Sequence, residues 1–175
     1  MDSRALRVMT SSVRHDWPTP WPFFSAVEKF FRAQYGGPFE LDCCADASNT
    51  KAPRYFSLAD NGLARPWWGR VWCNPPYGPE IELWVRKAAE ESRHGAIVAC
   101  LVPARTDTKW FHSWAVQAAE IRFIAGRIKF VGAESCAPFP SALLVFDGSR
   151  SDKRTMFWNP YDDNMSFSFE NRGRQ

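Results

Sequence analysis

An apolar run that stops abruptly at two prolines constrains the fold of this chain more than any other feature. Residues 71–73 are Val-Trp-Cys, and Asn74-Pro75-Pro76-Tyr77 follows them directly. The run predicts a buried β-strand, but proline has a fixed φ and no backbone N–H, so regular strand pairing must end at Asn74. We therefore expect a rigid loop at the end of this strand.

This loop suits a planar ring that carries an amine. The side-chain oxygen of Asn74 and the backbone carbonyl of Pro75 can accept hydrogen bonds from an exocyclic NH2 group, while the Tyr77 ring stacks on the face of the substrate ring. The loop offers no proton acceptor stronger than an amide, which favours direct attack of the amine on an activated electrophile. The alternative is an ordinary proline-stiffened turn with a buried tyrosine.

Helical and strand-like patterns alternate along the chain. Apolar residues recur at helical spacing over residues 22–36 and 81–95, and strand-like runs cover residues 38–46, 95–102 and 142–146. Two more alternating segments, residues 120–125 and 127–131, flank Gly126 and predict a hairpin-like pair. Together these patterns predict a doubly wound α/β sheet, mostly parallel, with an antiparallel pair near the carboxyl end.

Acidic residues follow the strand-like run at residues 38–46. In an open α/β sheet the carboxyl ends of the strands line the ligand crevice, so Asp42 and its neighbours are expected to meet the loop at Asn74. Asp60 lies in an Asp-Asn-Gly turn signal. For this residue a turn role is favoured over a ligand role.

Length and composition predict a single globular domain with terminal extensions. The chain has 175 residues, of which 45% are apolar and 23% charged. We expect a flexible basic arm at residues 1–15, the main domain at residues 16–148 and a polar, aromatic tail at residues 149–175. In the tail, Asn159-Pro160-Tyr161 imitates the loop at residues 74–77, but no strand pattern precedes it. No apolar run is long enough to span a membrane and there is no signal-peptide core, which predicts a cytoplasmic protein.

Charge and cysteine content give weaker indications. The net charge is +3 and arginine outnumbers lysine, which favours a polyanionic partner slightly because arginine makes forked contacts with phosphate. The five cysteines lack the paired C-x2-C spacing of a zinc site. We expect them to line the core or a pocket and expect no metal site, and metal binding by these cysteines is the alternative.

Several short motifs, in this order along the chain, resemble those of the phage-type DNA N6-adenine methyltransferases, a small Dam-like family. The motifs are Trp17-Pro-Thr-Pro20, Leu41-Asp-Cys-Cys-Ala45, Pro53-Arg-Tyr-Phe56, Asp60-Asn-Gly-Leu63, Asn74-Pro-Pro-Tyr77, Pro103-Ala-Arg-Thr-Asp107, Gly126-Arg-Ile-Lys-Phe130 and Phe139-Pro-Ser141. The resemblance covers the chain from about Trp17 to Phe146. The shared order of the motifs is far more specific than any one of them.

The resemblance implies a Rossmann-like methyltransferase sheet with S-adenosylmethionine as cofactor. It implies that the catalytic residues are Asn74, Pro75, Pro76 and Tyr77, and that the cofactor contacts are Thr19, Pro20, Asp42, Cys43, Cys44 and Ala45 for the methionine part and Asp60 near the nucleoside. The glycine-rich turn common in larger methyltransferases is replaced here by residues 43–46. The interval from there to the strand at residues 71–73 is short enough for a contracted sheet that has lost a strand.

The resemblance also implies double-stranded DNA as the partner, with the target adenine flipped out of the helix. Tyr77 and Phe139 would stack on the base. Arg105, Arg127 and Lys129 are candidates for phosphate contact, and a solvated surface role is equally open for all three. Cytosine N4, RNA adenine or a protein glutamine amide are alternative substrates, and a non-catalytic nucleic-acid-binding module is the alternative class. The recognised sequence and the choice between monomer and homodimer stay open.

Overall fold

The computed structural model describes residues 17–161 and the backbone of residues 166–169. The strands are β1 (Leu41–Asp42), β2 (Arg54–Tyr55), β3 (Arg70–Cys73), β4 (Ile97–Pro103), β5 (Glu120–Ile124), β6 (Ser141–Asp147), β7 (Arg154–Trp158) and β8 (Ser166–Phe169). The helices are α2 (Trp21–Tyr35), α3 (Ile81–Arg93) and α4 (Lys109–Ser113), with short 3-10 turns η1 (Gly62–Ala64) and η2 (Ala115–Gln117). The predicted basic arm at residues 1–15 lies outside the described residues.

All eight strands form one mixed sheet in the order β2-β1-β3-β4-β6-β5-β7-β8. Strands β2, β1, β3 and β4 pair in parallel, β6 is antiparallel to both β4 and β5, and β7 is parallel to β5. It follows that β1, β3, β4, β5 and β7 all point the same way and end at the same edge of the sheet. The prediction of a mostly parallel α/β sheet with antiparallel pairing near the carboxyl end is confirmed.

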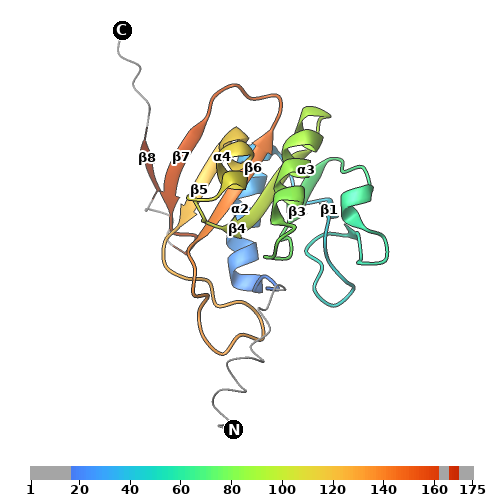
Figure 1. Cartoon of the computed structure of the whole chain (residues 1–175), viewed down its shortest axis with the longest axis horizontal. Coiled ribbons are helices and arrows are strands. Elements are labelled where there is room, and N and C mark those ends of the chain that lie inside the picture. Colours follow the sequence, from blue (N-terminus) through green and yellow to red (C-terminus); the bar gives the residue numbers. More distant parts are fainter. Residues whose placement is uncertain (1–16, 162–165, 170–175) are drawn as a thin grey trace.

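Helices cover both faces of this sheet, as a doubly wound fold requires. Figure 1 shows α2 behind the sheet and α3 and α4 in front of it. On the α2 face, the Phe24 ring packs on Trp72 of β3 at 5.3 Å between centroids. Helix α2 ends at Gly36, which adopts a φ of 77° and donates its N–H to the Arg32 carbonyl oxygen. Glycine suits this position because other residues are strained in that conformation.

The prediction that residues 127–131 pair with residues 120–125 as a hairpin is wrong. Strand β5 pairs with β6 instead, in the register Glu120↔Val145 to Phe123↔Ala142. Residues 127–131 form an extended loop in which Ile128 and Phe130 are buried while their neighbours are exposed. The alternation therefore reports which side chains are buried. It does not report backbone pairing, since the Val131 N–H donates to the Pro18 carbonyl oxygen at 3.0 Å.

The sheet continues beyond residue 148, where we expected the main domain to end. Strand β7 pairs with β5 over five residues, and β8 pairs with β7. The imitation motif at residues 159–161 is therefore preceded by a strand, contrary to our expectation, and it lies at the same sheet edge as the loop at residues 74–77. Between β1 and β3 lie only β2 and η1, with no α-helix in this described stretch. No helix in the described part of the chain is long and apolar enough to cross a membrane.

Candidate active site

The loops that follow β1 and β3 meet at the shared sheet edge and enclose a small polar recess. Its lining residues are Pro18, Thr19, Asp42, Cys44, Asn49, Lys51, Trp72 and Asn74. Four of the predicted site residues therefore lie together: Thr19, Asp42, Cys44 and Asn74. The recess has a volume of about 20 Å³, which is room for about one water molecule. It can hold a small polar group of a ligand, and the rest of the ligand must lie across its mouth.

The side chain of Asn74 is held in one orientation. Its Nδ2 donates to the Trp17 carbonyl oxygen at 2.6 Å and to Thr19 Oγ1 at 3.0 Å. Its Oδ1 is buried and has no hydrogen-bond partner among the described residues. A buried acceptor without a donor is costly, so its presence at a sheet edge points to a ligand that supplies an N–H or O–H.

The prolines and the tyrosine of the same loop have different surroundings. Pro75 is buried and Pro76 is exposed. Tyr77 is buried, and its hydroxyl donates to the Leu101 carbonyl oxygen at 3.2 Å. Burial raises the pKa of Tyr77 well above its usual value, so the hydroxyl stays protonated. The Tyr77 ring is thus largely enclosed by protein, whereas we expected it to lie open to a substrate ring.

Four aromatic rings gather beside Asn74. Tyr77 contacts Phe130 and Phe139 edgewise at centroid distances of 6.0 and 5.6 Å. Trp17 contacts the same two phenylalanines, each at 5.4 Å. Of the four, Trp17 and Phe139 are only partly buried. Trp17 was missed as a site residue on its own, although it begins the first of the motifs that carry the resemblance.

Asp42 and Lys51 place a carboxyl group and an ammonium group at the recess. Asp42 is buried and accepts hydrogen bonds from the backbone N–H of Lys51 at 2.9 Å and of Cys44 at 3.4 Å. Burial, with a smaller contribution from the charge of Cys44, raises the pKa of Asp42 to about 7. The Lys51 ammonium lies 4.0 Å from the centroid of the Trp21 ring, and burial lowers its pKa while Asp42 opposes that shift. Lys51 was not among the predicted site residues.

The other residues predicted to contact a cofactor lie around the recess without lining it. Pro20 is the N-cap of α2, and the Cys43 side chain is fully buried in the core. The Ala45 N–H donates to the Phe56 carbonyl oxygen at 3.0 Å. These three positions support the recess through the backbone.

Asp60 has the turn role that its sequence context favoured. Its carboxylate accepts hydrogen bonds from the Ser57 N–H at 2.8 Å and the Ser57 hydroxyl at 2.6 Å, and these bonds lower its pKa. The turn nevertheless lies against the end of β1, because a Cβ added to Gly62 would come within 2.0 Å of the Cys43 carbonyl oxygen. Only glycine permits this close approach.

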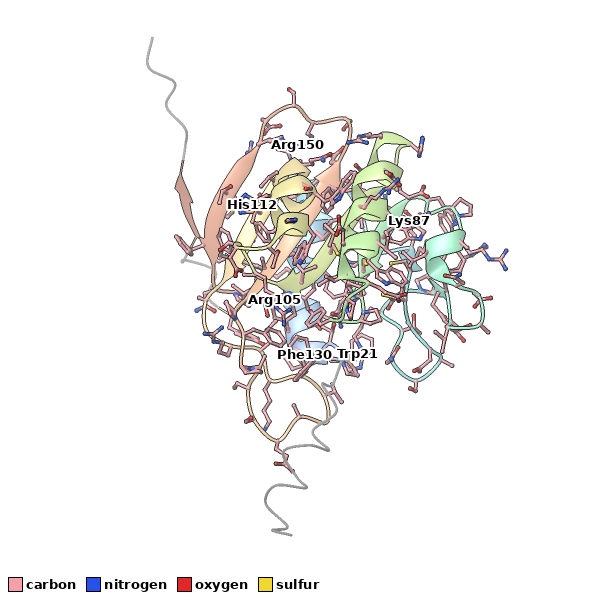
Figure 2. All side chains as sticks on the ribbon, in the orientation of Figure 1. Trp21, Lys87, Arg105, His112, Phe130 and Arg150 are labelled. Carbon is pink, nitrogen blue, oxygen red and sulfur yellow. The ribbon has the colours of Figure 1, made fainter. Side chains whose placement is uncertain are left out.

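The three predicted phosphate ligands are all exposed. Arg105 follows β4, whereas Arg127 and Lys129 lie in the loop between β5 and β6. In Figure 2, Arg105, Phe130 and Trp21 lie in the lower part of the view, and Arg150 lies at the opposite end. Buried Phe130 anchors the loop that carries Arg127 and Lys129 against Trp17 and Tyr77, which brings both cations to the edge that holds Asn74.

Comparisons with known proteins agree with this architecture. A family model described as DNA N-6-adenine-methyltransferase (Dam) matches residues 8–172. The chain is 34% identical to the DNA N-6-adenine-methyltransferase of Haemophilus phage HP1 (strain HP1c1) over 121 residues, 68% of each chain. It is 32% identical to the DNA N-6-adenine-methyltransferase of Escherichia phage T1 over 142 residues, 71% of this chain and 57% of that one.

One solved structure shares the fold at low sequence identity. It is the methyltransferase subunit of a type I restriction-modification system from Streptococcus thermophilus, with a TM-score of 0.50 and 12% identity. The match covers 89% of this chain and 50% of that one, so the chain spans about half the length of this structural relative.

Proposed function

The chain belongs to the DNA N-6-adenine-methyltransferase (Dam) family, and from this premise we propose that it methylates the N6 amine of adenine in double-stranded DNA with S-adenosylmethionine as methyl donor. The observation that carries the proposal is the buried Oδ1 of Asn74, an acceptor with no donor among the described residues. An adenine amine in the plane of this oxygen would supply the missing N–H.

The donor set of the recess fits the amino-acid end of the cofactor. The carboxylate of Asp42 suits an ammonium group, and the ammonium of Lys51 suits a carboxylate. Both line the same recess, with Thr19 and Cys44 beside them. When bound, S-adenosylmethionine supplies a methyl group already activated by its attachment to a sulfonium.

The residues of the loop after β3 position the amine. Asn74 Oδ1 and the Pro75 carbonyl would each accept one N6 hydrogen, which aims the nitrogen lone pair at the methyl group for direct in-line attack. The bonds from Nδ2 of Asn74 to Trp17 and Thr19 fix this direction before the substrate arrives. Catalysis would then come mainly from positioning, with no covalent enzyme intermediate.

The aromatic rings supply a surface for a flipped base. Extruding adenine from duplex DNA costs a few kcal/mol, and stacking on an aromatic side chain returns about 1 to 3 kcal/mol per base. Partly buried Phe139 and Trp17 are the rings open to such a contact. Tyr77 is enclosed, hydrogen-bonds to the Leu101 carbonyl oxygen and packs edgewise against Phe139, so it would support the Phe139 ring from the protein side.

Replacing Asn74 tests the proposal. We expect Asn74→Ala to fold and to keep cofactor binding, but to lose methyl transfer by about 100-fold or more, because the amine is no longer aimed. The measurement is N6-methyladenine in duplex DNA, by mass spectrometry of the nucleosides. Asn159→Ala is the matched control, since it changes the asparagine of the imitation motif at the same sheet edge. Full activity of Asn74→Ala would contradict the proposed catalytic role of Asn74.

The alternative substrates and the non-catalytic alternative are separated by two direct measurements. Nucleoside analysis that finds N4-methylcytosine in place of N6-methyladenine would move the proposal to cytosine. Calorimetry that finds no binding of S-adenosylmethionine would favour a DNA-binding module without catalysis. Location in the cytoplasm of a bacterial or phage-infected cell stays a prediction.

A further inference from the structure

Strand pairing brings cysteines from separate parts of the sequence into one row. β1 pairs with β3 in the register Asp42↔Trp72, and the Cys43 N–H continues this ladder with a bond of 3.0 Å to the Trp72 carbonyl oxygen. Cys43 and Cys73 are therefore neighbours on adjacent strands. Trp72 packs on α2, so the alternation of strand side chains puts both thiols on the opposite face, which α3 covers.

A third thiol completes the group. The sulfur atoms of Cys43, Cys44 and Cys73 all lie within 4.8 Å of one another. Cys43 and Cys73 are fully buried, whereas Cys44 is only partly buried and lines the recess beside Asn74. An ion from solvent can therefore reach the group through the recess, with Cys44 as the first contact.

We propose that Cys43, Cys44 and Cys73 bind one soft, thiophilic ion of the Zn²⁺ class through their three Sγ atoms. A tetrahedral zinc with bonds of about 2.3 Å holds its sulfurs about 3.8 Å apart, so the widest separation has to close by no more than about 1 Å. Cys44 lies in the loop after β1, beyond the strand pairing that fixes the other two cysteines. Cys100 pairs with Cys73 across β3 and β4, and its thiol adjoins that of Cys73, so it is a candidate for a fourth ligand.

The chemistry of the group selects a soft ion. All three candidate ligands are thiols, and a thiol must lose its proton to bind a metal ion as a thiolate. When a divalent ion binds, the three thiols release their three protons to solvent. Three thiolates and one divalent ion together carry one net negative charge. Only an ion with strong bonds to sulfur can drive this exchange, which excludes Mg²⁺ and Ca²⁺. The Lys51 ammonium on the same recess offsets part of the remaining charge.

An ion in this group would connect the two loops of the candidate active site. Cys44 follows Asp42 by two positions, and Cys73 directly precedes Asn74. The proposal does not depend on the methylation reaction, because it concerns metal binding by the free protein.

A Cd²⁺ titration of the reduced, full-length protein tests it. We expect one Cd²⁺ per chain, with the ultraviolet charge-transfer absorption of sulfur–cadmium bonds. Cys44→Ser is expected to weaken binding roughly tenfold or more, because a ligand is lost. The matched control is Cys136→Ser, which removes an exposed thiol outside the group and is expected to leave the affinity unchanged. Circular dichroism checks that both variants fold.

A second measurement on the unmodified chain keeps the test decisive if Cys44→Ser does not fold. Cd²⁺ is expected to slow alkylation of Cys44 by iodoacetamide, followed by mass spectrometry, and to leave the alkylation rate of Cys136 unchanged. Equal Cd²⁺ affinity of Cys44→Ser and the parent protein, or an unchanged alkylation rate of Cys44, would overturn the proposal.

Discussion

Two residues at the candidate site have polar groups buried away from water, which is unfavourable. The amide of Asn74 keeps one buried acceptor without a donor, and Asp42 keeps a carboxyl group away from solvent. Both features cost stability in the free protein and both are relieved when a ligand brings the complementary group. This is the pattern expected where a fold gives up local stability for function.

The pH dependence of stability should reveal the state of Asp42. Its pKa is raised from the usual 3.8 to about 7, so between these values the folded chain holds a proton that the unfolded chain has released. The contribution of Asp42 to stability therefore falls as the pH rises from about 4 to about 7, by at most about 1.4 kcal/mol per pH unit, and this contribution stays constant above that range. Urea unfolding at pH 5 and pH 8 should show this loss in the parent protein and a smaller loss in Asp42→Asn. Equal losses in the two proteins would mean that Asp42 titrates normally.

Among the elements, the loop between β5 and β6 marks the limit of sequence reasoning. Its alternating residues 127–131 predict a strand, and they do alternate between buried and exposed, but Val131 bonds to Pro18 from a distant segment. That bond depends on how the chain packs in three dimensions, which local periodicity does not contain. The helices α2 and α3 were predictable because their apolar spacing and glycine stops are local signals.

The candidate site likewise contains some residues that local sequence patterns predict and others that they do not. Asn74 was predictable because two prolines end its strand, and Asp42 because it ends a neighbouring strand. Lys51 and Trp17 were not predictable by themselves, since they reach the recess from loops whose paths are set by tertiary contacts. The burial of Tyr77 was also not predictable, because its hydroxyl donates a hydrogen bond to a carbonyl oxygen on β4, which is distant in the sequence.

The same loop carries a prediction about DNA binding. Arg127 and Lys129 are exposed on an element anchored beside the aromatic rings, and Arg105 follows β4 at the same edge. If each contacts one phosphate, replacing all three with glutamine should lower the slope of log affinity against log salt by about 0.9 per contact. Fluorescence anisotropy with duplex DNA over a salt series measures this slope. The control is Arg93→Gln, because Arg93 lies at the carboxyl end of α3, at the sheet edge opposite Asn74. A triple variant with the same slope as the parent protein would mean that Arg105, Arg127 and Lys129 are solvated surface residues.

At the scale of the whole molecule, the sheet includes a strand, β7, that local sequence patterns did not indicate. β7 buries Met156 and Trp158, and Trp158 lies against Phe30 of α2 at 5.6 Å. Trp158 also covers the buried ion pair of Arg122 with Glu120, since the Arg122 guanidinium lies 5.2 Å from the centroid of the Trp158 ring. The apolar run of β7 is only Met156, Phe157 and Trp158, with polar and charged residues before it, and a run of three is too short to predict a strand.

Truncation decides whether the main domain ends at residue 148. Removing β7 deletes two large buried apolar side chains, whose burial is worth about 1.5 to 3 kcal/mol each, and uncovers a buried ion pair. We expect residues 1–148 to lose about 3 to 6 kcal/mol relative to residues 1–161, which keep β7, a large part of the 5 to 15 kcal/mol typical of a domain. Urea unfolding followed by tryptophan fluorescence compares the two chains. Equal unfolding midpoints would show that the sheet is complete at β6 and that β7 is an addition to an independent domain, because a strand that stabilises its neighbours cannot be removed without lowering the midpoint.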